Sequence, residues 1–259
     1  MDVIDYKVND GVAELRLSRP ARLNAMNLQF FKDLADATAL AVQDESVRVI
    51  VISAEGNHFS SGLDLKEIPP SSQHLTSSNS IAELQRGFKT LAMASKPTIA
   101  SIKGYCIGGG LDLASACDFR LASADSLFSL REVRLGIAAD LGSLFFLQNV
   151  LPAAQVMELA LTGNDIDSQK AAAIGLITML VDTHEALEKA TRDLAVTLAS
   201  NPPLAVQATK RLILEDRFSN LERQLANAAE TNLALLASHD ASEAVQAILE
   251  KRPPRFCGS

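Results

Sequence analysis

The sequence has no tryptophan, only two tyrosines and no long apolar run. No apolar stretch approaches the roughly 20 residues that a membrane-spanning helix needs, so the sequence does not predict a membrane protein. The N-terminal residues MDVIDYKVND lack the basic-then-apolar order of a signal or transit peptide, and the C-terminal RFCGS matches no common address signal. We therefore expect a cytoplasmic protein.

Cysteine and histidine are also scarce. The three cysteines, Cys106, Cys117 and Cys257, are an odd number with no close spacing, which argues against a disulfide framework. The four histidines are scattered along the chain, and none has a cysteine or histidine at the sequence spacing typical of a metal site. We therefore expect no metal ion.

Basic residues are fewer than acidic ones, 24 against 31, and the net charge is -7. This balance disfavours binding to nucleic acids and to anionic membranes. The pattern GxGxxG fails because its third glycine position is Leu113, and neither GxxxxGK[ST] nor GxSxG occurs. Nucleotide hydrolysis and serine-hydrolase chemistry thus have no support in the sequence.

Strand-like and helix-like patterns alternate over the first part of the chain. The residues around Asn9–Gly11 predict a β-hairpin, and the β-branched run Val47–Ala54 predicts a buried strand. Apolar spacing predicts helices over residues 28–44 and about 81–95. Helical patterns dominate from about residue 141, with the strand-like LITMLVD, residues 176–182, as the main exception, and a helical appendage begins at about residue 200. We therefore expect an α/β protein with a core over residues 1–199 and a helical region over residues 200–259.

Three consecutive glycines, Gly108–Gly110, precede an acid in the segment CIGGGLDLASACD. They are expected to open a helix of roughly ten residues, whose first N–H groups are unpaired and open to a negative oxygen. The segment SSGLDLKE, residues 60–67, predicts a second such turn leading into a short helix. Two turns of this kind could form an oxyanion hole, but close packing of a helix on a strand would also explain the glycines.

Three acids, Asp112, Glu132 and Asp140, lie at the edges of apolar segments. Asp112 could simply place a favourable charge at a helix N-terminus, and Asp140 could be a helix N-cap. Glu132 could form a surface salt bridge with Arg131 or Arg134. Beside an oxyanion hole, however, the three acids become candidates for proton transfer, because burial raises a carboxyl pKa toward the useful range.

Four segments resemble the crotonase, or enoyl-CoA hydratase/isomerase, superfamily: RPARLNAMN, HFSSGLDLKE, SKPTIASIKGYCIGGGLDLASACDFRLAS and LEKRPPRF. They follow one another along nearly the whole chain. The resemblance implies a crotonase-like spiral of ββα turns, followed by a C-terminal helical region for oligomerisation or for covering the site. It also implies assembly into homotrimers or dimers of trimers.

The same resemblance implies an acyl-CoA thioester substrate, with coenzyme A entering as part of the substrate and no further cofactor. The backbone N–H groups of Leu63 and Gly109 would hold the thioester carbonyl oxygen. Contacts with the substrate and its CoA group are expected at Arg22, Ser60, Ser61, Gly62, Leu63, Asp64, Leu65 and Gly109.

The acids narrow the resemblance to one reaction. Hydratases of the superfamily typically carry Glu at the positions of both Asp112 and Glu132. The acids of this sequence, Asp112, Glu132 and Asp140 within GIAADLGS, instead resemble those of the Δ3,5-Δ2,4-dienoyl-CoA isomerases of fatty-acid β-oxidation. Glu132 would then remove the C2 proton of a 3,5-dienoyl-CoA, and an initially protonated Asp112 would donate a proton at C6. Asp140 would tune or orient Glu132.

Two alternatives stay open. The first is a trans-2-enoyl-CoA hydratase in which Asp112 and Glu132 hold a water molecule. The second is a non-catalytic crotonase-fold scaffold or RNA binder, which the acidic balance and the intact acid set disfavour. The sequence departs from the isomerase pattern at Phe145-Phe146, His58 and Lys66. These departures bear on which acyl chain is accepted more than on the type of reaction. Residues 69–80 are expected to form a mobile wall of the acyl pocket.

Overall fold

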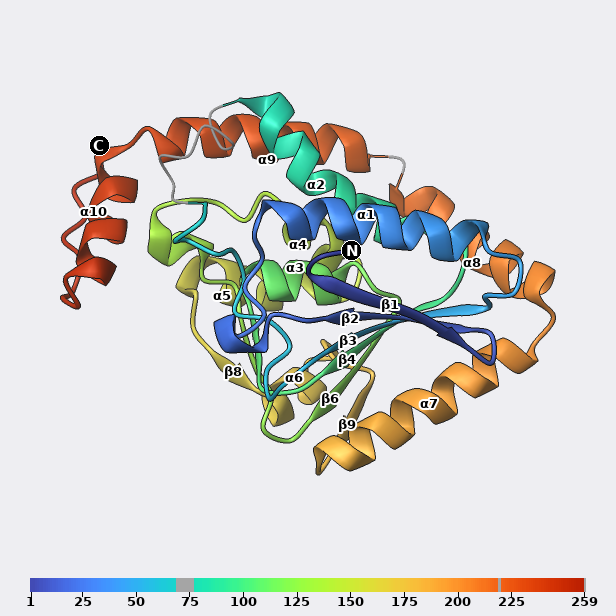
Figure 1. Ribbon diagram of the computed structural model, residues 1–259. Helices are drawn as coiled ribbons and strands as arrows, with labels where there is room; N and C mark the ends of the chain where they lie inside the picture. The colour runs from blue at the N-terminus through green and yellow to red at the C-terminus, as the bar shows by residue number, and fades with distance from the viewer. Residues whose placement is uncertain (69–76, 219, 259) are drawn as a thin grey trace.

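The computed structural model describes residues 1–68, 77–218 and 220–258. The strands of this part form a six-stranded sheet in the order β1-β2-β3-β4-β6-β9 and a three-stranded sheet in the order β5-β7-β8 (Figure 1). The strands are β1 Ile4–Asn9, β2 Val12–Leu17, β3 Val49–Ala54, β4 Thr98–Ile102, β5 Tyr105–Ile107, β6 Phe119–Ser123, β7 Leu127–Ser129, β8 Ile166–Asp167 and β9 Met179–Val181.

Helices make up most of the remaining described structure. The α-helices are α1 Leu28–Gln43, α2 Ser78–Ala92, α3 Gly109–Ser115, α4 Ser143–Gln148, α5 Ala153–Thr162, α6 Ser168–Ala173, α7 His184–Ser200, α8 Pro203–Phe218, α9 Leu221–Leu236 and α10 His239–Leu249. Two 3-10 helices are η1 Pro20–Arg22 and η3 Glu132–Leu135. None of the helices in the described ranges combines the length and the apolar character that crossing a membrane would require.

The chain winds as a spiral whose successive turns add strands to both sheets. β4 and β6 are parallel neighbours in the large sheet, and the strands that follow them, β5 and β7, are parallel neighbours in the small sheet. A parallel bridge between Ser60 and Cys106 connects the preceding turn to the small sheet. The predicted spiral of ββα turns is therefore confirmed.

Helices cover both faces of the large sheet. Figure 1 shows α1 and α2 over one face and α7 over the other. In β3, Ile50 and Ile52 belong to the main core, whereas Val49 and Val51 pack in a second cluster that includes Leu187 of α7. Because successive strand residues point to opposite faces, the continuous β-branched run results from burial of β3 on both sides.

The predicted hairpin is confirmed by the antiparallel pairing of β1 with β2, and the two N-terminal helices lie within three residues of their expected bounds. Two helix predictions are wrong. α3 ends at Ser115, because the Asp118 carboxylate accepts the N–H of Thr98 (2.8 Å) and returns the chain to the sheet for β6. Residues 65–67 form hydrogen-bonded turns and no helix.

The chain after residue 200 is helical, as expected. α9 packs across α2 and α4, and α10 projects at the end of the molecule opposite to α8, where it contacts η3 (Figure 1). The division at residue 200 and the role of this region in oligomerisation or in covering the site stay predictions. Residues 69–76 of the expected acyl-pocket wall lie outside the described residues.

Candidate active site

Two glycine-containing turns meet at the N-terminus of α3. Gly62 and Gly108 have φ angles of 88° and 52°, in a region that glycine adopts without strain. A Cβ atom placed on Gly62 would lie 3.2 Å from the Gly109 nitrogen, and one placed on Gly109 would lie 3.7 Å from the Leu63 nitrogen. Neither nitrogen donates a hydrogen bond to another described residue, so two unused N–H groups lie side by side.

The three consecutive glycines have different structural roles. A Cβ atom on Gly108 would lie 3.0 Å from Oε1 of Glu132, so this glycine makes room for the glutamate side chain. Gly109 carries the unused amide. A Cβ atom on Gly110 would lie 2.8 Å from the carbonyl oxygen of Ser60, so here close packing of α3 on the neighbouring turn requires glycine. Both explanations left open by the sequence therefore apply, at different positions.

Glu132 lies at the start of η3 and does not form the surface salt bridge considered above. Arg131 instead pairs with Asp165 (2.7 Å), and Arg134 donates to Asn164 (2.6 Å). Although Glu132 is half-buried as a residue, its Oε2 atom is buried and has no hydrogen-bond partner among the described residues. An unpartnered buried carboxyl oxygen costs free energy, which points to a group that engages a ligand.

Asp112 lies in the first turn of α3 and is buried. Its Oδ1 accepts the backbone N–H of Ser143 at 2.8 Å, which joins the start of α3 to the start of α4. Asp112 thus has a fixed orientation within the protein.

Asp140 is not a helix N-cap, because α4 begins at Ser143 with Gly142 as its N-cap. Its side chain is held from the C-terminal helices, where Nδ2 of Asn232 on α9 donates to Oδ2 at 2.8 Å. Its carbonyl oxygen accepts Nε2 of Gln85 on α2 at 2.7 Å. The loop that carries Asp140 is therefore attached to two helices distant in sequence.

Burial raises the pKa of all three carboxyls. The pKa of Asp112 rises from 3.8 to about 6, although the hydrogen bond from Ser143 lowers it. The pKa of Asp140 rises from 3.8 to about 7, against the lowering effect of Asn232. The pKa of Glu132 rises from 4.5 to about 8, because the charges of Asp112 and Asp140 add to the effect of burial.

The raised pKa of Asp112 agrees with the sequence prediction, but the pKa of Glu132 is raised further. Because the two groups influence each other, the two titration steps belong to the pair rather than to either residue. At neutral pH the pair holds one proton between an acid and a base.

A sequence profile of the family described as enoyl-CoA hydratase/isomerase matches residues 7–259. The chain belongs to the enoyl-CoA hydratase/isomerase family. It is 38% identical to a peroxisomal Δ(3,5)-Δ(2,4)-dienoyl-CoA isomerase of Arabidopsis thaliana, over 99% of this chain and 96% of the relative. It is 32% identical to an (E)-benzylidenesuccinyl-CoA hydratase of Thauera aromatica, over 99% of both chains. The crystal structure of an enoyl-CoA hydratase/isomerase from Pseudoalteromonas atlantica T6c superimposes with a TM-score of 0.90, at 27% identity, over 98% of this chain and 100% of that one.

Membership of the enoyl-CoA hydratase/isomerase family is consistent with an acyl-CoA substrate, and the structure shows what the residues expected to contact it do in the protein alone. Ser60 is occupied structurally, since its hydroxyl donates to the carbonyl oxygen of Asn24 (2.8 Å) and accepts the N–H of Gly62 (3.1 Å). Asp64 is paired with Arg19 at 3.1 Å. Arg22 is exposed at the end of η1. Contacts of Ser61, Leu65 and the others with CoA stay predictions.

Sequence reasoning missed three residues that hydrogen-bond to Asp112 or Asp140, namely Ser143, Asn232 and Gln85. Ser143 stands in the quoted segment GIAADLGS, but nothing there shows that its amide reaches Asp112. Asn232 and Gln85 lie on amphipathic helices and carry no sequence signal. Phe145 and Phe146, singled out as departures, pack with Phe218 of α8 at ring distances of 5.6 and 6.3 Å, so they join α4 to α8.

We predict that Asn232→Ala raises the pKa of Asp140 further. The variant removes the hydrogen bond that Asn232 donates to the carboxylate of Asp140. This hydrogen bond stabilises the ionised form and so lowers the pKa of Asp140. Carbon-detected NMR titration of the carboxyl groups measures the change. Asn227→Ala, at an exposed position on the same helix, is the control and should leave that titration unchanged. An unaltered Asp140 titration in Asn232→Ala would show that the asparagine does not tune the acid.

Proposed function

We propose that this protein is a Δ3,5-Δ2,4-dienoyl-CoA isomerase of fatty-acid β-oxidation. The observation that carries the proposal is the presence of two unused backbone N–H groups, of Leu63 and Gly109, at the N-terminus of α3, where Asp112 lies and Glu132 approaches Gly108. A dienoyl isomerisation needs an oxyanion hole, a base and an acid at separate carbon atoms. The identity to the Arabidopsis isomerase supports the same reaction.

In the proposed mechanism the thioester carbonyl oxygen accepts hydrogen bonds from Leu63 and Gly109, which acidifies the C2 proton. Glu132 removes that proton, and the negative charge spreads from the carbonyl oxygen to C6. Asp112 then donates a proton at C6, which gives the conjugated 2,4-diene. Glu132 has gained a proton and Asp112 has lost one, so a proton returns through solvent or between the coupled acids before the next cycle.

This mechanism requires the pair to hold one proton, located on Asp112 when the substrate is bound. Below a pH of about 6 both carboxyls are protonated and no base is present, and above about 8 both are ionised and no acid is present. We therefore predict a bell-shaped dependence of kcat/KM on pH, with limbs near 6 and 8. A rate that is constant from roughly pH 5 to 9 would contradict a shared proton.

The direct test supplies a 3,5-dienoyl-CoA and a trans-2-enoyl-CoA to the purified protein in parallel. The isomerase forms the conjugated 2,4-diene from the first substrate, which is followed by its absorbance. Loss of enoyl absorbance from the second substrate reports hydration. Hydration without diene formation would replace the proposal by the hydratase alternative, which the identity to the Thauera hydratase favours.

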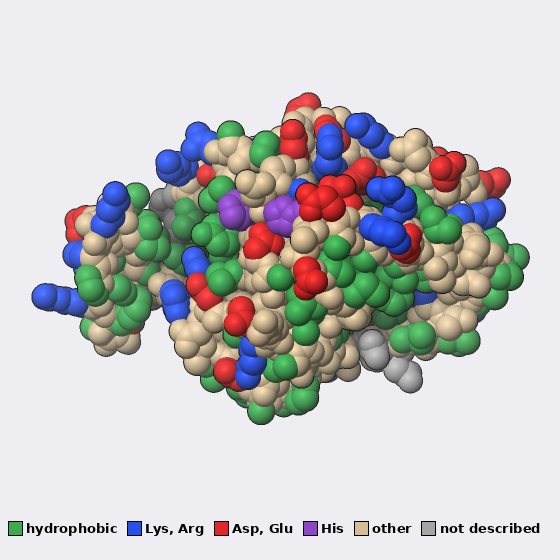
Figure 2. Space-filling model, turned by 90° about the horizontal axis from the view of Figure 1, so that it is seen from below, with side chains coloured by type: hydrophobic (Ala, Val, Ile, Leu, Met, Phe, Trp, Pro, Cys, Tyr) green, Lys and Arg blue, Asp and Glu red, His purple; other side chains and the backbone are tan. Residues whose placement is uncertain are grey.

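A non-catalytic RNA-binding role has less support. On the face of the molecule drawn in Figure 2, acidic and basic side chains are interspersed and do not gather into a basic stripe. Assembly into trimers or dimers of trimers, independence of any cofactor beyond the CoA of the substrate, and a cytoplasmic location stay predictions. The Arabidopsis relative is named as a peroxisomal enzyme.

A further inference from the structure

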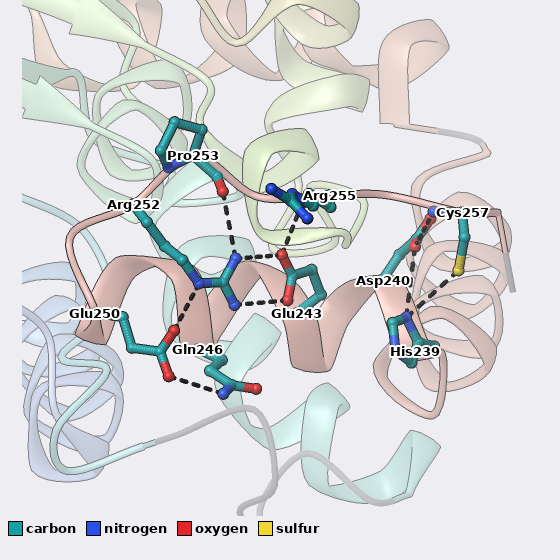
Figure 3. A network of polar contacts seen from close by, with 9 residues as sticks. All are labelled: His239, Asp240, Glu243, Gln246, Glu250, Arg252, Pro253, Arg255 and Cys257. Atoms are coloured by element: carbon teal, nitrogen blue, oxygen red, sulfur yellow. Dashed lines mark hydrogen bonds and ion pairs between the residues drawn. The ribbon is translucent and has the colours of Figure 1, made fainter.

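Outside the proposed active site, the end of the chain turns back along α10 (Figure 3). Arg252 forms a bidentate ion pair with Glu243 of α10, at 2.6 and 2.9 Å. The N–H of Arg255 donates to the same carboxylate at 2.7 Å. These contacts hold the first part of the C-terminal segment against the middle of the helix.

The last part of the segment is held at the N-terminus of α10. The backbone N–H groups of Cys257 and Gly258 donate to Oδ1 and Oδ2 of Asp240, at 2.7 and 2.9 Å. As a result, Sγ of Cys257 lies 3.4 Å from Nδ1 of His239 (Figure 3). Two residues separated by 18 positions, too far apart for the sequence to suggest a pair, are thereby brought into contact.

The three side chains offer a nitrogen, an oxygen and a sulfur ligand atom within 4.8 Å of one another. Tetrahedral zinc, with bonds of about 2.3 Å to sulfur and about 2.0 Å to nitrogen, separates these two ligand atoms by about 3.5 Å. The observed distance of 3.4 Å between Cys257 and His239 already matches that geometry. Oδ1 of Asp240, 4.0 Å from Nδ1 of His239 and within 4.8 Å of Sγ of Cys257, needs to approach by about 1 Å.

We propose that His239, Asp240 and Cys257 bind a zinc ion that fixes the C-terminal segment to α10. Cys257 binds as the thiolate after its proton passes to solvent, and the thiolate and the carboxylate together balance the double positive charge. A water molecule completes the tetrahedron. The mixed set of nitrogen, oxygen and sulfur ligands is one that zinc accepts readily.

Two structural features hold the three candidate ligand atoms in place. The backbone N–H groups that reach Asp240 orient its carboxylate, as outer hydrogen bonds do for metal ligands, while each oxygen retains a further lone pair. The ion pair of Arg252 with Glu243 fixes the segment independently, so the ligands are positioned before a metal arrives. Sequence analysis predicted no metal, because it considered only ligand spacing along the chain.

Cobalt binding tests the proposal on the full-length, reduced protein after treatment with a chelator. We expect one equivalent of Co²⁺ to bind per chain, to give a thiolate-to-cobalt charge-transfer absorption, and to be displaced by Zn²⁺. Cys257→Ser should abolish this absorption, and His239→Ala should weaken binding. His184→Ala is the matched control, since His184 also contacts an aspartate, Asp125, at 2.9 Å. It should bind cobalt as the unmodified protein does.

Three results would overturn the zinc site. The first is the absence of a charge-transfer absorption, which would leave only a thiol–imidazole hydrogen bond. The second is an absorption that persists in Cys257→Ser. The third is an equal loss of binding in His239→Ala and His184→Ala. None of these results affects the proposed isomerase reaction, because the cluster contains no residue assigned to that site.

Discussion

In the Glu132→Gln variant, exchange of the C2 proton with solvent deuterium should fall by about 10²–10⁴-fold, while acyl-CoA binding is largely retained. Glutamine occupies nearly the same volume beside Gly108 but cannot accept the proton. Mass spectrometry of deuterium in recovered acyl-CoA measures the exchange, and calorimetry measures binding. Exchange at the wild-type rate would show that Glu132 is not the C2 base.

The same substitution should make the protein more stable at neutral pH. Glu132 has a folded-state pKa of about 8 against an ordinary value of 4.5. Below pH 4.5 it is neutral in both states, so it imposes no penalty. As the pH rises from 4.5 to 8, ionisation stabilises only the unfolded state, and folding stability is lost. At pH 8 the gain from glutamine is about 1–3 kcal/mol after allowance for its own buried amide.

Thermal unfolding at several pH values measures this gain. For a chain of this size we expect the Tm of the variant relative to the wild type to be higher by roughly 3–10 °C at pH 8 than near pH 4.5. The exposed Glu188→Gln is the control and should show no such pH-dependent difference. If Glu132→Gln were less stable than wild type at pH 8, the carboxyl would not be held neutral by burial.

Gly62→Ala should reduce kcat by about 10²–10³-fold, the loss found when an oxyanion donor is removed. The new methyl group would lie 3.2 Å from the Gly109 nitrogen, where the thioester oxygen has to approach, and 2.8 Å from the carbonyl oxygen of Ile107. Steady-state kinetics with a 3,5-dienoyl-CoA, combined with Tm, separates loss of catalysis from loss of folding.

Gly175→Ala provides a matched control for backbone strain. Gly175 has a φ of 82°, close to the 88° of Gly62, but its added Cβ atom would meet nothing within 4 Å. Both variants therefore carry a similar conformational cost of roughly 1–2 kcal/mol. Only Gly62→Ala should lose catalysis. An equal loss in both variants would attribute the effect to strain and remove the oxyanion hole from the mechanism.

Patterns of neighbouring residues in the sequence predicted the strands and turns that short-range interactions determine. The hairpin follows from Asp10-Gly11, and β3 follows from a β-branched run buried on both faces. The end of α3 was not predictable, because it depends on a contact between Asp118 and Thr98, 20 residues apart. Where tertiary contacts terminate an element, periodicity along the chain carries no signal.

The same distinction applies to the site. The resemblance implied a protonated Asp112, and the direction of its pKa shift agrees with that role. The larger rise in the pKa of Glu132 was not predictable, because it depends on burial and on how the charges of Asp112 and Asp140 add to it in space. The role of Gly110 in packing on Ser60 also required the structure.

The hydrogen bond from Asn232 to Asp140 joins residues 92 positions apart. During synthesis, Asp140 leaves the ribosome well before its partner, so a nascent chain that has completed the spiral still lacks this contact. The site is therefore finished only when α9 has emerged and docked. The surroundings that set the pKa of Asp140 are thus completed at the end of translation rather than when the sheets close.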